Sequence, residues 1–333
     1  MKRVLIKDRI RRKDEFLFFM HQFVEECRRQ GFKHKKDILP SYRFFVRSIT
    51  RRFLFSGYRV IDRLMPGSLH RKQALIVTSK CDDLVDNIFP YYGYEIIPML
   101  WDVWPAVQRR MIHDLKRFHC KTVFVTVRQV AQRLKQELGI NAYWIPEGID
   151  TSIYHQGLPL AERPHQVLEM GRQHPGYHRM LTRLHGEGKI AGLLSSNDKD
   201  GMLHKNTLTF PSMYDLCQSL PQYQVLPCFP QCDTNPGRAG DIETLTQRYW
   251  EGMLSRNILI GRAPQELIDL VGYNPVVDVD WNNAEEQILH ILNNIADYQP
   301  LVDKNRATAL EKGTWATRMP MMKKILAKIG YNI

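Results

Sequence analysis

The sequence predicts an α/β fold made of two doubly wound domains, with a basic helical segment at the start of the chain. Its 333 residues suit two domains of roughly 150 residues better than one core. From residue 74 onward, short apolar runs alternate with segments of helical periodicity, which is typical of parallel sheets covered by helices. The first 72 residues differ from this body in pattern and in charge.

The positive charge of the chain is concentrated in that first segment. The formal net charge is +12, and residues 1–72 hold 20 Lys and Arg against 7 Asp and Glu. Residues 73–333 hold 27 against 28 and are almost neutral. This distribution excludes a protein that coats nucleic acid along its length, and we expect no specific nucleic-acid partner. With 25% charged and 10% aromatic residues, a disordered or collagen-like chain is also excluded.

Residues 1–72 are expected to be helical and to belong to the N-terminal domain. Apolar residues recur at helical spacing in two sets, one from Phe16 to Cys27 and one from Tyr42 to Phe53. The second set shares its helix with a stripe of arginines four residues apart, namely Arg43, Arg47 and Arg51. Such a helix can lie on an anionic membrane. The alternative is a core-facing helix with solvated arginines, and the pattern leaves both open.

An N-terminal α/β domain is predicted over residues 73–150. Its strands are expected at 74–79, 95–100, 121–126 and 141–146, with helices at 103–118 and 127–138. Residues 151–164 lose all periodicity and are predicted to be a linker.

A C-terminal α/β domain is predicted over residues 165–310. Strands are expected at 166–170, 189–194, 223–229, 257–260 and 275–279, with helices at 175–185, 212–220, 244–254, 264–271 and 284–295. Residues 311–333 are expected to form a further helix after a break near Gly313. Because ligands bind at the carboxyl ends of parallel strands, we expect the active site in a cleft between the two domains.

The six cysteines are scattered without a Cys-x-x-Cys pair, which favours reduced thiols over a redox or zinc motif. No signal peptide and no uncharged apolar stretch of transmembrane length is recognised. We therefore expect a cytoplasmic protein, with any membrane contact peripheral.

The most informative stretch is Cys228–Gly261, where Glu243 and Glu251 bracket seven residues. Thr244, Thr246 and Gln247 are expected at a helix N-terminus, where unpaired N–H groups favour an anion such as phosphate. An acidic residue in the helix body can accept both hydroxyls of a ribose. The alternative is an ordinary helix with one solvated glutamate.

This stretch resembles the glycosyltransferase group 1 family, retaining enzymes of the GT-B fold with a Glu-x7-Glu hallmark. The strand at 257–261 stands where the family's next strand lies. Three other elements agree: residues 167–172 (VLEMGR), residues 144–151 (WIPEGIDT) and the terminal helices. The resemblance implies two Rossmann-like domains with a cleft between them and terminal helices that cross back to the first domain. It covers roughly residues 74–330, more clearly in the second half.

The resemblance also implies roles. Glu251 would bind the donor ribose and Glu243 the hydroxyls of the transferred sugar. Gly171, Arg172 and the backbone near Thr244 and Thr246 would bind the diphosphate, with Arg248 and Arg238 as further candidates. An arginine beside glutamates is alternatively a surface ion pair. No metal and no cofactor beyond the nucleotide-sugar co-substrate is implied.

The chain departs from the family in three places. Residues 244–246 (TLT) replace a Gly-aromatic-Gly, the lysine expected after Gly-Arg is missing, and the Gly-rich loop near the chain start is absent. His178 or Arg179 could supply the missing charge. These departures indicate an atypical branch of the family.

On the acceptor side, Asp102 could steer a hydroxyl, and Trp101 or Trp104 could stack on a sugar. The alternative is a helix N-cap beside core tryptophans. The expected function is sugar transfer from a nucleotide-sugar donor to a glycan or lipid-linked acceptor in cell-surface polysaccharide synthesis. The alternatives are a membrane- or nucleic-acid-binding protein on the same scaffold, or a sugar-nucleotide enzyme that does not transfer.

Overall fold

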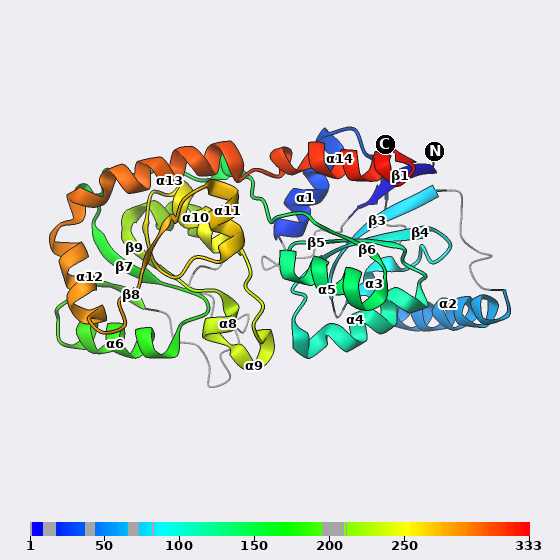
Figure 1. The fold of residues 1–333 in the computed structure, drawn as a ribbon, viewed down its shortest axis with the longest axis horizontal. Coiled ribbons are helices and arrows are strands. Elements are labelled where there is room, and N and C mark those ends of the chain that lie inside the picture. Colours follow the sequence, from blue (N-terminus) through cyan, green and yellow to red (C-terminus); the bar gives the residue numbers. More distant parts are fainter. Residues whose placement is uncertain are drawn as a thin grey trace. The chain divides into compact units, whose positions relative to one another are not determined.

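The computed structural model describes residues 2–8, 18–36, 44–65, 73–81, 83–194, 210 and 212–333. They fall into two units: Met1–Pro146 with Trp315–Ile333 (unit 1), and Glu147–Thr314 (unit 2). Figure 1 labels most of their α-helices and strands. No helix of the described ranges combines the length and the hydropathy that crossing a bilayer requires.

Unit 1 is built on a seven-stranded parallel sheet in the order β12-β1-β3-β4-β5-β6, with β2 also paired to β1. The strands are β1 (Lys2–Lys7), β2 (Lys33–Lys35), β3 (Gln73–Lys80), β4 (Glu95–Trp101), β5 (Thr122–Val125), β6 (Asn141–Trp144) and β12 (Tyr331–Asn332). The helical elements are α1 (Phe18–Arg29), α2 (Phe44–Leu64), α3 (Leu84–Ile88), α4 (Pro105–Arg117), α5 (Arg128–Leu138), η7 (Trp315–Arg318) and α14 (Met319–Lys328).

The prediction that residues 1–72 are helical throughout is wrong at β1 and β2. β1 lies inside the sheet, where its residues Arg3–Ile6 pair with Gln73–Ile76 of β3. Its apolar residues Val4, Leu5 and Ile6 are buried, because a central parallel strand is covered on both faces. The Lys and Arg residues around this short apolar run hid the strand in the sequence.

Unit 2 is built on a five-stranded parallel sheet in the order β11-β10-β9-β7-β8. Its strands are β7 (His165–Glu169), β8 (Gly192–Leu194), β9 (Tyr223–Cys228), β10 (Ile258–Gly261) and β11 (Val276–Asp278). Its helical elements are η2 (Thr151–Ile153), η3 (Leu160–Glu162), α6 (Pro175–Gly186), α7 (Met213–Ser219), η5 (Leu220–Gln222), α8 (Gln231–Thr234), α9 (Pro236–Ala239), α10 (Gln247–Leu254), α11 (Gln265–Val271), α12 (Ala284–Asn293), η6 (Ile295–Tyr298) and α13 (Gln299–Lys312).

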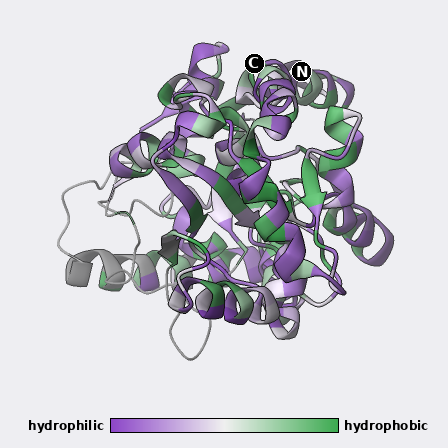
Figure 2. Ribbon diagram, turned by 90° about the vertical axis from the view of Figure 1, so that its left-hand side faces the viewer, coloured by the Kyte–Doolittle hydropathy of each residue, from purple (hydrophilic) through white to green (hydrophobic). Residues whose placement is uncertain are grey.

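Successive strand residues of unit 2 serve two cores, one on each face of the sheet. Leu226 of β9 and Leu259 of β10 pack in the core that contains Trp250 of α10. Val225 and Ile258, each one residue earlier, pack in the core on the other face. This alternation follows from the two-residue period of a strand. In Figure 2, green hydrophobic segments are frequent in the middle of the view, and purple hydrophilic segments alternate with green along many helices.

The predicted linker, residues 151–164, belongs instead to unit 2. Arg163 is buried and donates to the carbonyl oxygens of Leu158, Tyr223, Gln156 and Ser255. Leu160 is fully buried beside β7. The chain returns to unit 1 at Trp315. Near its end, β12 pairs with the start of β1.

Candidate functional site

The candidate site lies in unit 2, at the edge of the sheet where β7, β9 and β10 end. All three strands are parallel, so the residues after Glu169, Cys228 and Gly261 meet at the same edge. α10 runs along one face of this sheet. Gly252 allows the helix to lie close, because a Cβ there would be 2.3 Å from Cδ2 of Leu259.

The turn after β7 is built around Gly171. This buried glycine has φ +74°, a conformation that side chains with a Cβ disfavour. A Cβ on Gly171 would lie 3.4 Å from Nη2 of Arg248, so the guanidinium of α10 sits directly against the turn. Arg172 follows with an exposed side chain, and its charge acts to lower the pKa of Tyr249, which burial raises.

Arg248 and Glu251 lie one turn apart on α10 and form an ion pair. Arg248 Nε is 3.4 Å from Glu251 Oε2, and Tyr154 OH donates to Oε1 at 3.4 Å. Glu251 is only 3% exposed. Burial raises the pKa of the Glu251 carboxyl, and Arg248 and Tyr154 oppose this shift.

This pair leaves hydrogen-bonding capacity unused. Arg248 Nη1 and Glu251 Oε2 are buried, and neither has a hydrogen-bond partner within the described part of the chain. The same holds for Thr244 Oγ1, in the segment that leads into α10, and for Gln247 Oε1. Because buried polar groups are normally satisfied, these atoms are available to a bound ligand or to water.

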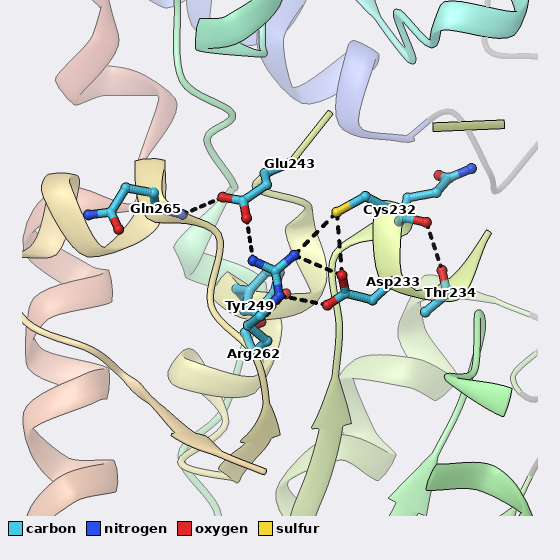
Figure 3. Close-up of polar contacts among 8 residues, drawn as sticks. Cys232, Asp233, Thr234, Glu243, Tyr249, Arg262 and Gln265 are labelled. Atoms are coloured by element: carbon cyan, nitrogen blue, oxygen red, sulfur yellow. Dashed lines mark hydrogen bonds and ion pairs between the residues drawn. The ribbon is translucent and has the colours of Figure 1, made fainter. Parts of the chain in front are cut away.

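A second cluster surrounds Arg262, the first residue after β10 (Figure 3). Arg262 Nε and Nη2 donate to the two carboxylate oxygens of Asp233 at 2.7 and 2.8 Å, and Nη1 donates to Glu243 Oε1. The hydrogen bonds from Arg262 to Asp233 and Glu243 raise the pKa of its guanidinium. Glu243 Oε2 accepts the backbone N–H of Gln265 at 3.0 Å, so both oxygens of Glu243 already have a donor.

A reciprocal bond completes this arrangement. The backbone N–H of Leu245 donates to Oε1 of the buried Glu266 at 2.6 Å. Two hydrogen bonds of opposite direction therefore hold the loop segment 243–245 to the beginning of α11. Arg262, Asp233 and Glu266 escaped the sequence prediction, although the position of Arg262 at a strand's carboxyl end was a usable signal.

The predicted helix N-terminus at Thr244 is wrong. α10 begins at Gln247, and Thr246 is its N-cap residue without a side-chain cap bond. Thr244 lies in the loop before α10, and the N–H of Leu245 donates to Glu266. The alternative of a solvated Glu251 is also wrong, because Glu251 is buried. Arg248 does form an ion pair with a glutamate, and its own side chain is partly exposed.

The other cationic candidates have different surroundings. His178 Nδ1 is 2.5 Å from Oε2 of the buried Glu169, whose pKa burial raises and His178 lowers. Arg179 is exposed on α6. Arg238 lies in α9, where its backbone N–H donates to Asn235.

The acceptor candidates lie in unit 1. Trp101 is 2% exposed and packs against Phe19, Phe23 and Trp315, so stacking of a sugar on its ring is excluded by burial. Trp104 is equally buried. Asp102 is no N-cap, since Trp104 holds that position for α4. Asp102 has φ 52° and lies 3.9 Å from Lys80 Nζ.

Within the described ranges, no group of three or more His, Cys, Asp or Glu side chains is arranged to hold a metal ion.

Comparison with known proteins gives a structural likeness only. No protein-family model and no curated protein matches the chain. Among solved structures, HepE of Anabaena with UDP and glucose is similar with a TM-score of 0.60 at 10% identity, over 98% of this chain and all of that one. Sucrose-phosphate synthase of Thermosynechococcus elongatus gives 0.59 at 13% identity, over 99% of both chains. A glycosyltransferase of Rickettsia africae gives 0.54 at 12% identity, over 98% of both.

These likenesses extend over almost the whole chain, and they agree with the two parallel sheets described above. The chain therefore has two Rossmann-like domains and the GT-B fold of these structures.

Proposed function

We propose that this protein is a glycosyltransferase that uses a nucleotide-sugar donor. The observation that carries the proposal is the Arg248–Glu251 pair at the carboxyl edge of the unit 2 sheet: the glutamate is buried, and the arginine lies against the Gly171 turn. The fold supports it, because similar structures include HepE crystallised with UDP and with UDP-glucose.

In this proposal the donor diphosphate lies against the Gly171 turn. Arg248 and Arg172 neutralise the negative charge that grows on the diphosphate as the sugar leaves. Glu251 orients the Arg248 guanidinium, and its Oε2, which has no hydrogen-bond partner in the described residues, accepts a ribose hydroxyl. A low-polarity setting strengthens each of these contacts.

In the same proposal, Glu243 both holds the loop through Arg262 and Gln265 and binds the transferred sugar. Each of its oxygens already accepts one N–H, but a carboxylate oxygen has a second lone pair. The half-buried carboxylate can therefore accept hydroxyls of the transferred sugar while Arg262 and Gln265 fix its direction. The Thr-Leu-Thr segment beside it would shape the sugar pocket.

We further propose retention of the anomeric configuration and transfer without a divalent cation, as in the family that the sequence resembles. The proposed acceptor is a glycan or lipid-linked glycan of cell-surface polysaccharide synthesis, modified in the cytoplasm. The six cysteines are all free in the structure, which supports a reducing compartment.

A thermal-shift screen with nucleoside diphosphates and nucleotide sugars tests the donor. A true donor stabilises the fold in proportion to the logarithm of its concentration over its dissociation constant. Arg248→Gln should abolish that shift, whereas Arg183→Gln, which breaks a solvent-exposed Arg–Glu pair in the same unit, should keep it. Equal shifts in both variants would remove Arg248 from the site.

The stereochemistry and the metal requirement are tested with the donor that the screen identifies. NMR of the first product should show the anomeric configuration of the donor, and chelation of divalent ions should leave the rate unchanged. An inverted product, or a rate that returns only with added Mg²⁺, contradicts the respective part of the proposal.

A further inference from the structure

The outward face of α2 holds large apolar side chains in solvent. Phe53 and Leu64 are 77% and 76% exposed. They belong to a set on α2 and the residue after it: Ile49, Phe53, Leu54, Val60, Ile61, Leu64 and Met65. Elsewhere in the described ranges, such residues are scattered along the sequence. A concentration of this kind indicates an interaction surface rather than ordinary surface composition.

The opposite face of α2 is firmly packed on unit 1. Tyr58 is buried, stacks on Tyr92 and Phe118, and its OH donates to the carbonyl oxygen of Arg117. Asp62 lies 2.8 Å from Nε2 of His119. The helix therefore does face the core, as one alternative expected, but through Tyr58. Ile49 and Phe53 of the predicted apolar set are exposed instead.

Arginines run beside the apolar stripe. Arg52, Arg59 and Arg63 are all exposed and are spaced seven and four residues apart. Phe53, Val60 and Leu64 follow them by one residue each, so the two stripes lie next to each other on the helix. The predicted stripe of Arg43, Arg47 and Arg51 involves side chains outside the described residues.

No carboxylate of α2 opposes these arginines, because its one acidic residue, Asp62, is held by His119. The adjoining α4 adds exposed Arg109, Arg110 and Lys116, and its one acidic residue, Asp114, is buried. A partner that complements this surface must have both an apolar region and negatively charged groups.

We propose that the outward face of α2 docks unit 1 onto an anionic lipid bilayer. Its apolar stripe enters the boundary between headgroups and acyl chains, and the arginines bind lipid phosphates. A second copy of this chain fits less well, because a symmetric contact would bring like-charged arginine stripes together. The basic surplus of residues 1–72 adds to the attraction.

Flotation of the full-length protein with vesicles tests this docking directly. Vesicles of equimolar phosphatidylcholine and phosphatidylglycerol should bind the protein far better than vesicles of phosphatidylcholine alone. Binding to the anionic vesicles should be strong at about 0.01 M salt and weaker at about 0.15 M salt, because salt screens the charges. Phe53→Ser with Leu64→Ser should weaken partitioning at least about tenfold at both salt concentrations. A triple variant should weaken vesicle binding about 100-fold at low salt; it carries Arg52→Gln, Arg59→Gln and Arg63→Gln. This estimate multiplies a factor of about five for each arginine.

Matched controls remove similar groups from other exposed positions. Tyr214→Ser removes a 72% exposed ring from α7, and Lys135→Gln, Lys324→Gln and Lys328→Gln remove three charges from α5 and α14. Both controls should bind vesicles like the unmodified protein.

Three results would overturn the proposal. One is vesicle binding that the α2 variants leave unchanged. Another is that the unmodified protein and its variants do not bind lipid, but the unmodified protein self-associates and Phe53→Ser with Leu64→Ser abolishes this self-association. That result would assign the face to contact with a second copy of the chain. The third is arginine-dependent binding to duplex DNA without lipid binding. Sugar transfer is not measured, so the outcome is independent of the proposed reaction.

Discussion

Two arginine–carboxylate clusters lie at the same edge of the unit 2 sheet. They differ in how many of their hydrogen-bonding groups are satisfied by the chain itself. Arg262 meets both oxygens of Asp233 and one of Glu243, in a cluster that remains partly open to solvent. Arg248 and Glu251 meet through one longer contact, and the glutamate is buried. The first cluster is satisfied by the chain itself.

The second cluster is not satisfied, since Arg248 Nη1 and Glu251 Oε2 are buried without hydrogen-bond partners in the described residues. A buried charge pair contributes little net stability, and unused donors add to its cost. We infer that the Arg262 cluster fastens the loop and that the Arg248 cluster serves a ligand. The following predictions test that division.

The largest effect is expected from Arg248→Leu. It leaves the buried Glu251 carboxylate without its cation, which should lower the free energy of unfolding by about 3–5 kcal/mol. Adding Glu251→Leu should restore most of this loss, because apolar residues of similar size replace buried ion pairs well. Urea unfolding measures both, and additive losses would show that the two residues do not act as a pair.

A smaller loss, about 1–2 kcal/mol, is expected for Arg262→Leu. Its bonds to Asp233 and Glu243 are charge-assisted, but water reaches the carboxylates once the arginine is gone. The same urea experiment measures it. If Arg262→Leu lowered the free energy of unfolding as much as Arg248→Leu, water would not reach the Asp233 and Glu243 carboxylates. The distinction between the two clusters would then be wrong.

Gly171→Ala should cost about 1 kcal/mol of stability, because alanine is strained at φ +74°. Its Cβ would also contact Nη2 of Arg248, at 3.4 Å. Gly186→Ala, at the end of α6 where nothing lies within 4 Å, should be neutral or stabilising. Equal effects on thermal unfolding would contradict the assigned role of the Gly171 turn.

The smallest effect concerns pH. Because the pKa of Glu251 is raised in the folded state, ionising it costs stability as pH rises from about 4.5 through the folded-state pKa. Relative to Glu251→Gln, the unmodified protein should therefore lose stability over this range. A difference in unfolding free energy that stays flat, or that grows in favour of the unmodified protein, contradicts the raised pKa.

The sequence predicted the sheets better than the site. Runs such as residues 74–79 and 223–229 are apolar because parallel strands are covered on both faces, so β3 and β9 were recognisable. β1 was missed because its apolar run is only three residues long and is framed by Lys and Arg. In unit 2, the linker prediction failed because packing of Leu160 and Arg163 leaves no periodic signal.

For the site, residue types were predictable and surroundings were not. Glu243, Arg248, Glu251 and Gly171 were identified from spacing and resemblance, and the structure brings the last three together. Burial of Glu251 and the contact from Tyr154 depend on tertiary packing, as does the engagement of Glu243 by Arg262. Trp101 shows the converse, since a residue at a strand end became core.

Calorimetric titration with UDP tests the central claim most directly, in the unmodified protein, the Arg248→Leu/Glu251→Leu double variant and Arg262→Leu. The first variant should bind about 100-fold more weakly, because charge-assisted bonds to phosphate are lost from a fold that remains stable. Arg262→Leu should stay within about threefold, as expected of a group that shapes a loop without touching the diphosphate. Unchanged affinity in the double variant, or an equal loss in Arg262→Leu, would contradict the division between the two clusters.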